Sequence, residues 1–233
     1  MSTVSIMQPY FFPYIGYFAL IATSDLFLVL DDVYFPKKKF VNRNFFIDEA
    51  GEKRIFNLPL VNASQNRKIN EISIFVPGKK GIHKIRSWIS GLPYRKDADI
   101  TLDFFFDQLN SCNNISTLNT RMIKFICANL NIETKFIDTL DGVCSEYSGE
   151  ERILKLVKRF EGSKYLNLPG GRKLYHKRDF FVEGLDLEFI ELDEEFRALG
   201  RYSYASILQV IGIFGYGSLF ELLAQRKNEI NHR

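Results

Sequence analysis

Two adjacent carboxylates, Asp31 and Asp32, close an apolar run and stand shortly before a second polar group. That group holds two amides and a guanidinium, Asn42, Arg43 and Asn44, which is more hydrogen-bonding capacity than a turn requires. Paired carboxylates at a strand end can orient an amine, ligate Mg²⁺, or act as a general base after like-charge repulsion raises the pKa of one of them. Arg43 can hold a phosphate or carboxylate through two hydrogen bonds. The structural alternative is that Asp31 caps the following turn while Arg43 pairs with Asp32.

An aromatic segment over residues 8–17, Gln-Pro-Tyr-Phe-Phe-Pro-Tyr-Ile-Gly-Tyr, precedes these carboxylates. The flanking patterns predict a strand over 4–8, a short helix over 16–23 and a strand over 26–31. The loop and the carboxylates should therefore meet at the carboxyl edge of a parallel sheet, where open α/β folds bind ligands. The expected catalytic residues are Asp31, Asp32 and Gln8, and the expected substrate-binding residues of this edge are Pro9, Tyr10, Tyr14, Gly16, Tyr17, Asn42, Arg43 and Asn44.

The run Tyr14-Ile15-Gly16-Tyr17 occupies the place where nucleotidyl-transferring α/β folds carry His-Ile-Gly-His. In those folds the glycine opens the helix toward the nucleotide, and two imidazoles stabilise the phosphate transition state with charge. A tyrosine donates a hydrogen bond but is neutral at pH 7. The run therefore favours nucleotide or phosphate binding at a helix N-terminus and argues against unmodified adenylyl transfer.

Basic and glycine-rich segments elsewhere suit an anion. Residues 37–39 are three lysines, and residues 170–175, Gly-Gly-Arg-Lys-Leu-Tyr, follow a predicted strand without the spacing of a Walker loop. A polar loop near residues 62–68 could complete the same edge. The alternative for each segment is a solvated surface or a tight turn. The further predicted substrate-binding residues are Lys37, Gln65, Lys68, Gly170, Gly171 and Tyr175.

Several classes of site and location are disfavoured. The three histidines lack the HxxxH or HExxH spacing, so no metal site is expected. Three irregularly spaced cysteines support neither a disulfide framework nor a CxxC site and fit a reducing cytosol. A net charge of +3 does not single out nucleic acid as a partner. Neither a secretory signal pattern nor a run of about 18 apolar residues is present, so we expect a cytoplasmic protein without a membrane span.

The 233 residues suffice for one well-buried domain. Strand patterns prevail up to about residue 77, including a hairpin around Ala50-Gly51 and an alternating strand over 71–76. Helical patterns follow from residue 82 to 130, and then strands near 131–137, 164–168 and 185–192 alternate with helices at 150–160, from 177, 205–214 and 219–225. We predict a single α/β domain over 1–233: a mostly parallel Rossmann-like sheet flanked by helices, with an antiparallel hairpin insertion at about 40–77, a helical segment at about 82–130 and a C-terminal helical part.

Together these motifs resemble the WbqC-like family, which is encoded in bacterial surface-polysaccharide gene clusters. The resemblance is carried by residues 8–18, by Asp31-Asp32-Val33 with Lys37 and residues 42–44, by Leu58-Pro59-Leu60, and by Gly170-Gly171 with Tyr175 and Phe180. Two positions depart from the family pattern, Phe40, where Trp is frequent, and Gln209, where an Asp is expected. The resemblance implies a cytoplasmic enzyme needed for O-antigen or a related glycan, acting on a nucleotide-linked sugar.

Three functions are compatible with these features. The leading hypothesis is an N-acyl- or aminoacyltransferase for a nucleotide-linked amino sugar, with a coenzyme A thioester or an aminoacyl-tRNA as the donor. In it, Asp31 or Asp32 handles the sugar amine, and Arg43 with Lys37 holds phosphate. The second is nucleotidyl transfer or ATP-dependent ligation at the helix that begins near Gly16. The third is a non-catalytic sugar-nucleotide-binding component of a glycan pathway.

Overall fold

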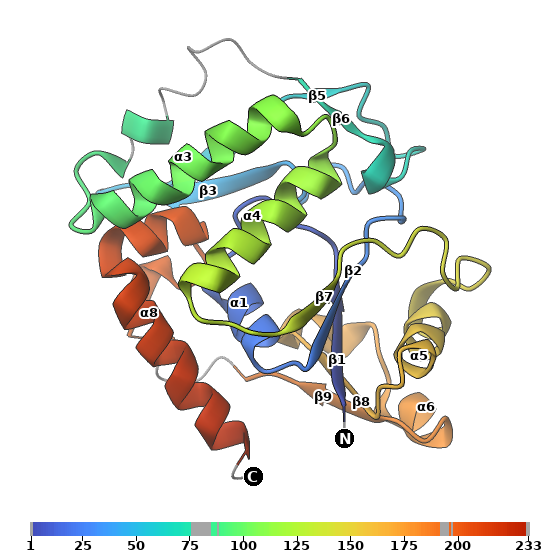
Figure 1. Cartoon of the computed structure of the whole chain (residues 1–233). Coiled ribbons are helices and arrows are strands. Elements are labelled where there is room, and N and C mark those ends of the chain that lie inside the picture. Colours follow the sequence, from blue (N-terminus) through green and yellow to red (C-terminus); the bar gives the residue numbers. More distant parts are fainter. Residues whose placement is uncertain (1, 76–84, 88, 192–195, 197, 232–233) are drawn as a thin grey trace.

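A five-stranded parallel sheet forms the centre of the protein (Figure 1). The structure is a computed structural model that describes residues 2–75, 85–87, 89–191, 196 and 198–231. For residues 226–231 it describes the backbone alone. The sheet confirms the predicted α/β class. Its strands, in spatial order, are β7 (Lys135–Ile137), β2 (Leu26–Val29), β1 (Thr3–Met7), β8 (Lys164–Asn167) and β9 (Asp186–Phe189).

Side chains of successive strand residues enter two cores on opposite faces of the sheet. Phe27 and Val29 face one core and Leu28 faces the other, as the two-residue period of a strand requires. The larger core packs on α1 (Ile15–Ala22), α3 (Arg95–Ser111), α4 (Ile115–Asn129) and α8 (Ile207–Asn231). The smaller core packs on α5 (Gly149–Arg159) and α6 (Lys177–Val182). Figure 1 shows these two groups of helices on either side of the sheet.

Two small antiparallel sheets fill the insertion between β2 and α3. The hairpin β3 (Arg43–Ile47) and β4 (Lys53–Asn57) turns at residues 48–52, as predicted. The second pair, β5 (Leu60–Val61) and β6 (Ser73–Ile74), is much shorter than the strand predicted over 71–76, and Val76 lies outside the described residues. A 3₁₀ helix, η1 (Ile69–Glu71), takes the start of that run, because the Glu71 carboxylate accepts a hydrogen bond from the Lys68 amide and closes a turn.

Local side chains account for the start of α4 and for the kink of α8. The Asn114 side chain accepts hydrogen bonds from the amides of residues 116 and 117 and starts α4. The two predicted C-terminal helices are the two halves of α8, since Gly215 leaves the helical region with φ 74° and ψ 160°. Asp97 accepts the amide of Tyr216 at 2.9 Å and so satisfies a donor that the kink frees. Of the helical pattern expected from residue 82, residues 82–84 and 88 lie outside the described residues. The remaining short 3₁₀ helices are η2 (Pro169–Lys173) and η3 (Gly200–Tyr202).

Candidate functional site

The order of the strands places a crevice between β1 and β8. From β1 the chain passes through β2 to β7 at one edge, then returns beyond β1 to β8 and continues to β9 at the other edge. The connections after β1 and β8 therefore leave in opposite directions, which is the topological switch point where open α/β sheets bind ligands. A cavity of about 780 Å³ lies there, and its lining residues include Met7 and Gln8 at the end of β1 and Asn167 and Leu168 at the end of β8.

The aromatic segment after β1 forms the first wall of this cavity, with Gln8, Tyr10, Pro13 and Tyr14. The hydroxyl of Tyr17 donates to the Gln8 carbonyl at 2.8 Å, so this tyrosine anchors the loop from below. The wall therefore contains four residues of the segment that the sequence singled out.

Two buried amides hold the backbone of this wall. The Nδ2 group of Asn44 donates to the carbonyls of Phe11 and Phe12 at 3.0 and 2.6 Å, and Asn44 also lines the cavity. Phe12 has a φ of 46°, a conformation that non-glycine residues adopt rarely and that needs such support. The Nδ2 group of Asn119 donates to the carbonyls of Pro9 and Val41. Sequence reasoning missed Asn119, whose signal was an amide at the helical spacing of the apolar residues Ile115 and Met122.

The second wall follows β8 and contains the predicted glycine pair. Asn167 accepts the Leu168 amide through Oδ1 at 2.7 Å, which fixes its side chain beside Gly171. A Cβ atom on Gly171 would lie 2.5 Å from Asn167 Nδ2, so this close approach requires glycine. A Cβ atom on Gly170 would meet nothing within 4 Å. Tyr175 completes the wall.

The third wall comes from residues that were not among the predicted site residues, although some belong to segments that the sequence singled out. Lys39 and Phe40 precede the hairpin, Phe45 and Lys53 belong to β3 and β4, and Tyr204 follows η3. The Tyr204 ring stacks on Tyr14, with ring centroids 5.5 Å apart and an interplanar angle of 27°. The three consecutive lysines at residues 37–39 were the sequence signal for Lys39. Only the tertiary structure shows that Lys39, and neither of the other two, lines the cavity.

Among the residues that the structure describes, the cavity is lined by hydrogen-bond donors and by no carboxylate side chain. Its lining residues include two lysines but neither aspartate nor glutamate. Burial raises the pKa of Tyr10, Tyr14 and Tyr175 above the ordinary phenol value, with a further rise from neighbouring tyrosines for the first two. All three phenols are therefore protonated at neutral pH and able to donate. This lining suits a ligand that is rich in acceptors, such as phosphate, and that carries rings or apolar faces.

Asp31 lies outside this lining, in a buried network at the end of β2. Its carboxylate accepts the hydroxyls of Ser116 at 2.8 Å and Thr139 at 2.9 Å, from α4 and from the segment after β7. Burial raises the pKa of Asp31, and these two hydrogen bonds oppose the rise. Asp31 therefore joins distant segments rather than capping the turn that follows it.

Asp32 forms a buried ion pair with Arg152 of α5, and not with Arg43 as the structural alternative expected. Its Oδ2 lies 2.6 Å from Arg152 Nη2, and the two side chains are 1% and 9% exposed. The same oxygen accepts the Gly142 amide at 3.0 Å. Neither Asp32 nor Asp31 is among the cavity-lining residues, so a general-base role at this cavity has no support from their positions.

The other predicted residues divide between buried supports and solvent-facing positions. Gly16 and Tyr17 lie buried in the first turn of α1, and Pro9 is buried within the loop that follows β1. Asn42 donates to the Leu58 carbonyl and so braces the hairpin. Of the predicted substrate-binding residues, those that do not line the cavity are Pro9, Gly16, Tyr17, Lys37, Asn42, Arg43, Gln65 and Lys68. The tertiary structure thus brings together Gln8, Tyr10, Tyr14, Asn44, Gly170, Gly171 and Tyr175.

The two departures from the family pattern have different positions. Phe40 lines the cavity, and its ring centroid lies 5.8 Å from that of Tyr10. Gln209 is buried on α8 and exchanges two hydrogen bonds with the backbone of Ile47 in β3. Phe40 is thus placed for contact with a ligand, whereas Gln209 fixes the hairpin to the core.

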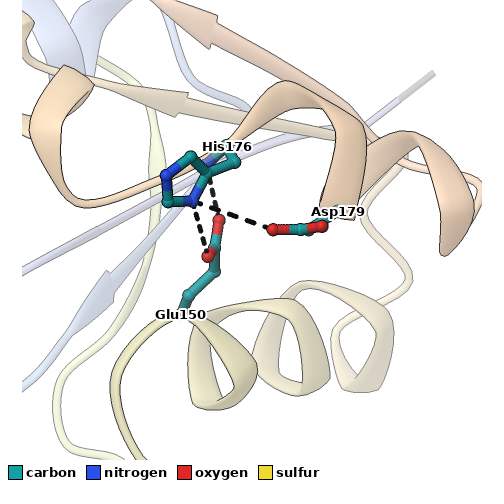
Figure 2. A group of neighbouring side chains, drawn as sticks. All are labelled: Glu150, His176 and Asp179. Carbon is teal, nitrogen blue, oxygen red and sulfur yellow. Dashed lines mark hydrogen bonds and ion pairs between the residues drawn. The ribbon is translucent and has the colours of Figure 1, made fainter.

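One group of side chains has the composition of a metal site. Glu150, His176 and Asp179 each offer a ligand atom within 4.8 Å of the others, at positions that range from half-buried to exposed (Figure 2). Glu150 accepts the His176 amide at 2.6 Å and lies 3.2 Å from its Nδ1. These contacts tie the start of α5 to the residue after Tyr175, so the group accounts for the placement of the second wall.

The stretch Ile207–Gln225 of α8 is the one helix, among the described residues, that is long and apolar enough to cross a membrane. Half of it is buried inside the protein, where α8 packs on α1 and α3. A core helix of a soluble protein has the same length and composition, and here packing on the two other helices accounts for its apolar sequence.

Comparison with known proteins identifies the family. Residues 8–214 match the model described as the WbqC-like protein family. The chain is also similar to a curated relative in Mycobacterium tuberculosis (strain ATCC 25618 / H37Rv), "Uncharacterized protein Rv1507c", with 26% identity over 196 residues, or 83% of this chain and 84% of that protein. No solved structure matches the chain significantly. Since the family model covers most of the chain, including all three walls of the cavity, the chain belongs to the WbqC-like protein family.

Proposed function

We propose that the cavity between β1 and β8 binds a nucleotide-linked amino sugar and that the protein is a cytoplasmic acyl- or aminoacyltransferase for bacterial surface polysaccharide, including O-antigen. One observation carries the proposal: a cavity at the switch point of a parallel sheet that is lined, within the described ranges, by aromatic rings and hydrogen-bond donors but by no carboxylate. A nucleotide-linked sugar matches this lining, because its base and sugar ring have apolar faces and its diphosphate has only acceptors.

The size of the cavity supports this class of ligand. A volume of about 780 Å³ falls within the range of about 300–1,000 Å³ for small-molecule sites. The stacked rings of Tyr14 and Tyr204 offer a flat aromatic surface at the third wall. The open space in front of Gly170 lets a ligand approach the backbone after β8.

The proposed reaction is attack of the sugar amine, as the free base, on the carbonyl carbon of the donor. The donor is a coenzyme A thioester or an aminoacyl-tRNA. As the C–N bond forms, the carbonyl oxygen gains negative charge. The carbonyl forms again when the bond to the thiolate sulfur or the ribose oxygen breaks, and this leaving group takes the proton that the amine loses. A protonated phenol such as Tyr175, on the wall after β8, suits the stabilisation of this oxyanion. In this scheme Asp31 and Asp32 are positioning residues that hold the end of β2.

Nucleotidyl transfer receives less support from the same geometry. The helix that would receive a nucleotide begins with Ile15 and Gly16, which are fully buried, and the Tyr17 hydroxyl is already bonded to the Gln8 carbonyl. The binding-only hypothesis predicts binding of a sugar nucleotide without any product, so an assay of products distinguishes it from the transferase.

The test is titration calorimetry of the purified protein with UDP-, dTDP- and GDP-linked amino sugars, followed by mass spectrometry after addition of acyl-coenzyme A or aminoacyl-tRNA. We expect binding of at least one sugar nucleotide and a mass gain equal to the transferred acyl group. Tyr175→Phe should lower the rate, whereas Tyr34→Phe, at a residue 68% exposed and outside the cavity, should leave it unchanged. Absence of binding refutes the site assignment, and binding without a mass gain refutes the transferase.

A further inference from the structure

Lys39 and Lys53 place two positive charges on the third wall of the cavity, and we propose that they form the subsite for the phosphate groups of the ligand. The inference rests on the proposed function and deepens it. It fixes the orientation of the ligand, with its phosphates toward the hairpin and its sugar toward the Gly170-Gly171 wall. It also moves the phosphate contact from the expected residues Lys37 and Arg43 to two residues that the sequence did not assign to the site.

Both lysines are held by segments that are tied to the cavity. The turn that carries Lys39 is closed by a hydrogen bond from its amide to the Pro36 carbonyl. The next residue, Phe40, accepts the Phe11 amide at 2.8 Å, which joins this turn to the first wall. Lys53 opens β4, and its Nζ lies 4.7 Å from the centre of the Phe45 ring, itself a lining residue.

Two cations next to lining residues, Arg54 and Arg172, are paired with carboxylates, whereas no ion pair of Lys39 or Lys53 is found among the described residues. Arg54 pairs with Asp48, and Arg172 pairs with Glu191. Within the described part of the chain, no carboxylate lies within ion-pair distance of Lys39 or Lys53, and no acidic side chain lines the cavity. Lys39 and Lys53 thus add two unpaired positive charges to the lining of a concave site, where charge attracts an anion most effectively.

The proposal is consistent with the donors elsewhere in the cavity. Tyr10, beside the Lys39-Phe40 turn, keeps its proton and can donate to the same phosphate. Lysine binds phosphate as a mobile point charge, so two lysines on separate segments can follow either group of a diphosphate. Lys37 lies on the same turn as Lys39 but does not line the cavity.

The test compares Lys39→Gln, Lys53→Gln and their double variant with Lys37→Gln, which removes the same charge from the same turn. Titration calorimetry with inorganic pyrophosphate, UDP and uridine reports the phosphate and nucleoside parts separately. Each cavity variant should weaken UDP and pyrophosphate about tenfold, equivalent to about 1.4 kcal/mol, and leave uridine unchanged. Lys37→Gln should bind all three probes like the parent protein, and the losses should shrink at high salt.

The outcomes separate this inference from the proposed function. Equal effects of Lys39→Gln and Lys37→Gln, or undiminished pyrophosphate binding in the double variant, overturn the phosphate subsite. If sugar nucleotides bind and react in that case, the proposed function stands without it. If pyrophosphate binds through both lysines but no sugar nucleotide binds, the subsite stands and the proposed function fails. Thermal melting of each variant verifies that the fold is retained.

Discussion

The buried pair Asp32 and Arg152 gives the sharpest test of whether the carboxylates after β2 are structural or catalytic. Their charged atoms lie 2.6 Å apart, with the side chains 1% and 9% exposed. Asp32→Ala leaves the guanidinium buried with one remaining acceptor, the Val143 carbonyl at 3.1 Å. Removal of one partner of such a pair costs about 3–5 kcal/mol, because the other charge stays uncompensated. For a chain of this length that loss lowers Tm by about 6–20 °C.

The assay is urea unfolding of four proteins, the parent, Asp32→Ala, Arg152→Met and the double variant Asp32→Ala/Arg152→Met. The double variant should be more stable than Asp32→Ala, because Met fills the space of the arginine without a charge. The control is Asp138→Ala, which breaks an exposed pair with Lys124 and should cost less than about 1 kcal/mol. An Asp32→Ala loss no larger than that of the control refutes the reasoning. Lost transferase activity with unchanged stability would instead assign Asp32 to the chemistry.

Three other substitutions probe the supports of the cavity. Gly171→Ala should cost about 1–3 kcal/mol through overpacking and should weaken UDP binding. Gly170→Ala should do neither, because there is open space at that position. Equal effects of the two variants in melting and calorimetry would contradict the close approach of Asn167 to Gly171. The pKa of Asp31 is higher in the folded than in the unfolded state, so its contribution to stability is present below the unfolded pKa and is lost as pH rises through the folded pKa. Asp31→Asn should therefore flatten the decline of the unfolding free energy between these two pKa values, and an unchanged decline in urea titrations at a series of pH values counts against it. Gln209→Glu removes the donor to the Ile47 carbonyl and should destabilise the protein by about 1–3 kcal/mol. Thermal melting measures this loss, and an unchanged melting temperature would contradict the role given to Gln209.

Local signals predicted the elements well where each element is determined by its own residues. The strands at residues 4–8 and 26–31 and the helix at 150–160 were recognisable from apolar periodicity alone, since a buried face imposes its period on the sequence. The strand expected over 71–76 failed, because the Glu71 side chain closes a turn and the partner strand offers only two residues for pairing. The third wall was missed for a related reason: Tyr204 stacks on Tyr14 from a segment nearly 200 residues away, and no local pattern records that contact.

The sequence by itself determined the α/β class, the aromatic loop after the first strand and the glycine pair after the fourth strand along the sheet, because alternation, loop composition and glycine content are local properties. The tertiary structure alone decided what the polar residues do. Asp31 and Asp32 have the types and spacing of a catalytic pair, but both are buried, and α4 and α5 supply Ser116 and Arg152 as their partners. Charge and hydrogen bonding act through space, so the neighbours that determine a carboxylate's role come from the fold and not from adjacent residues.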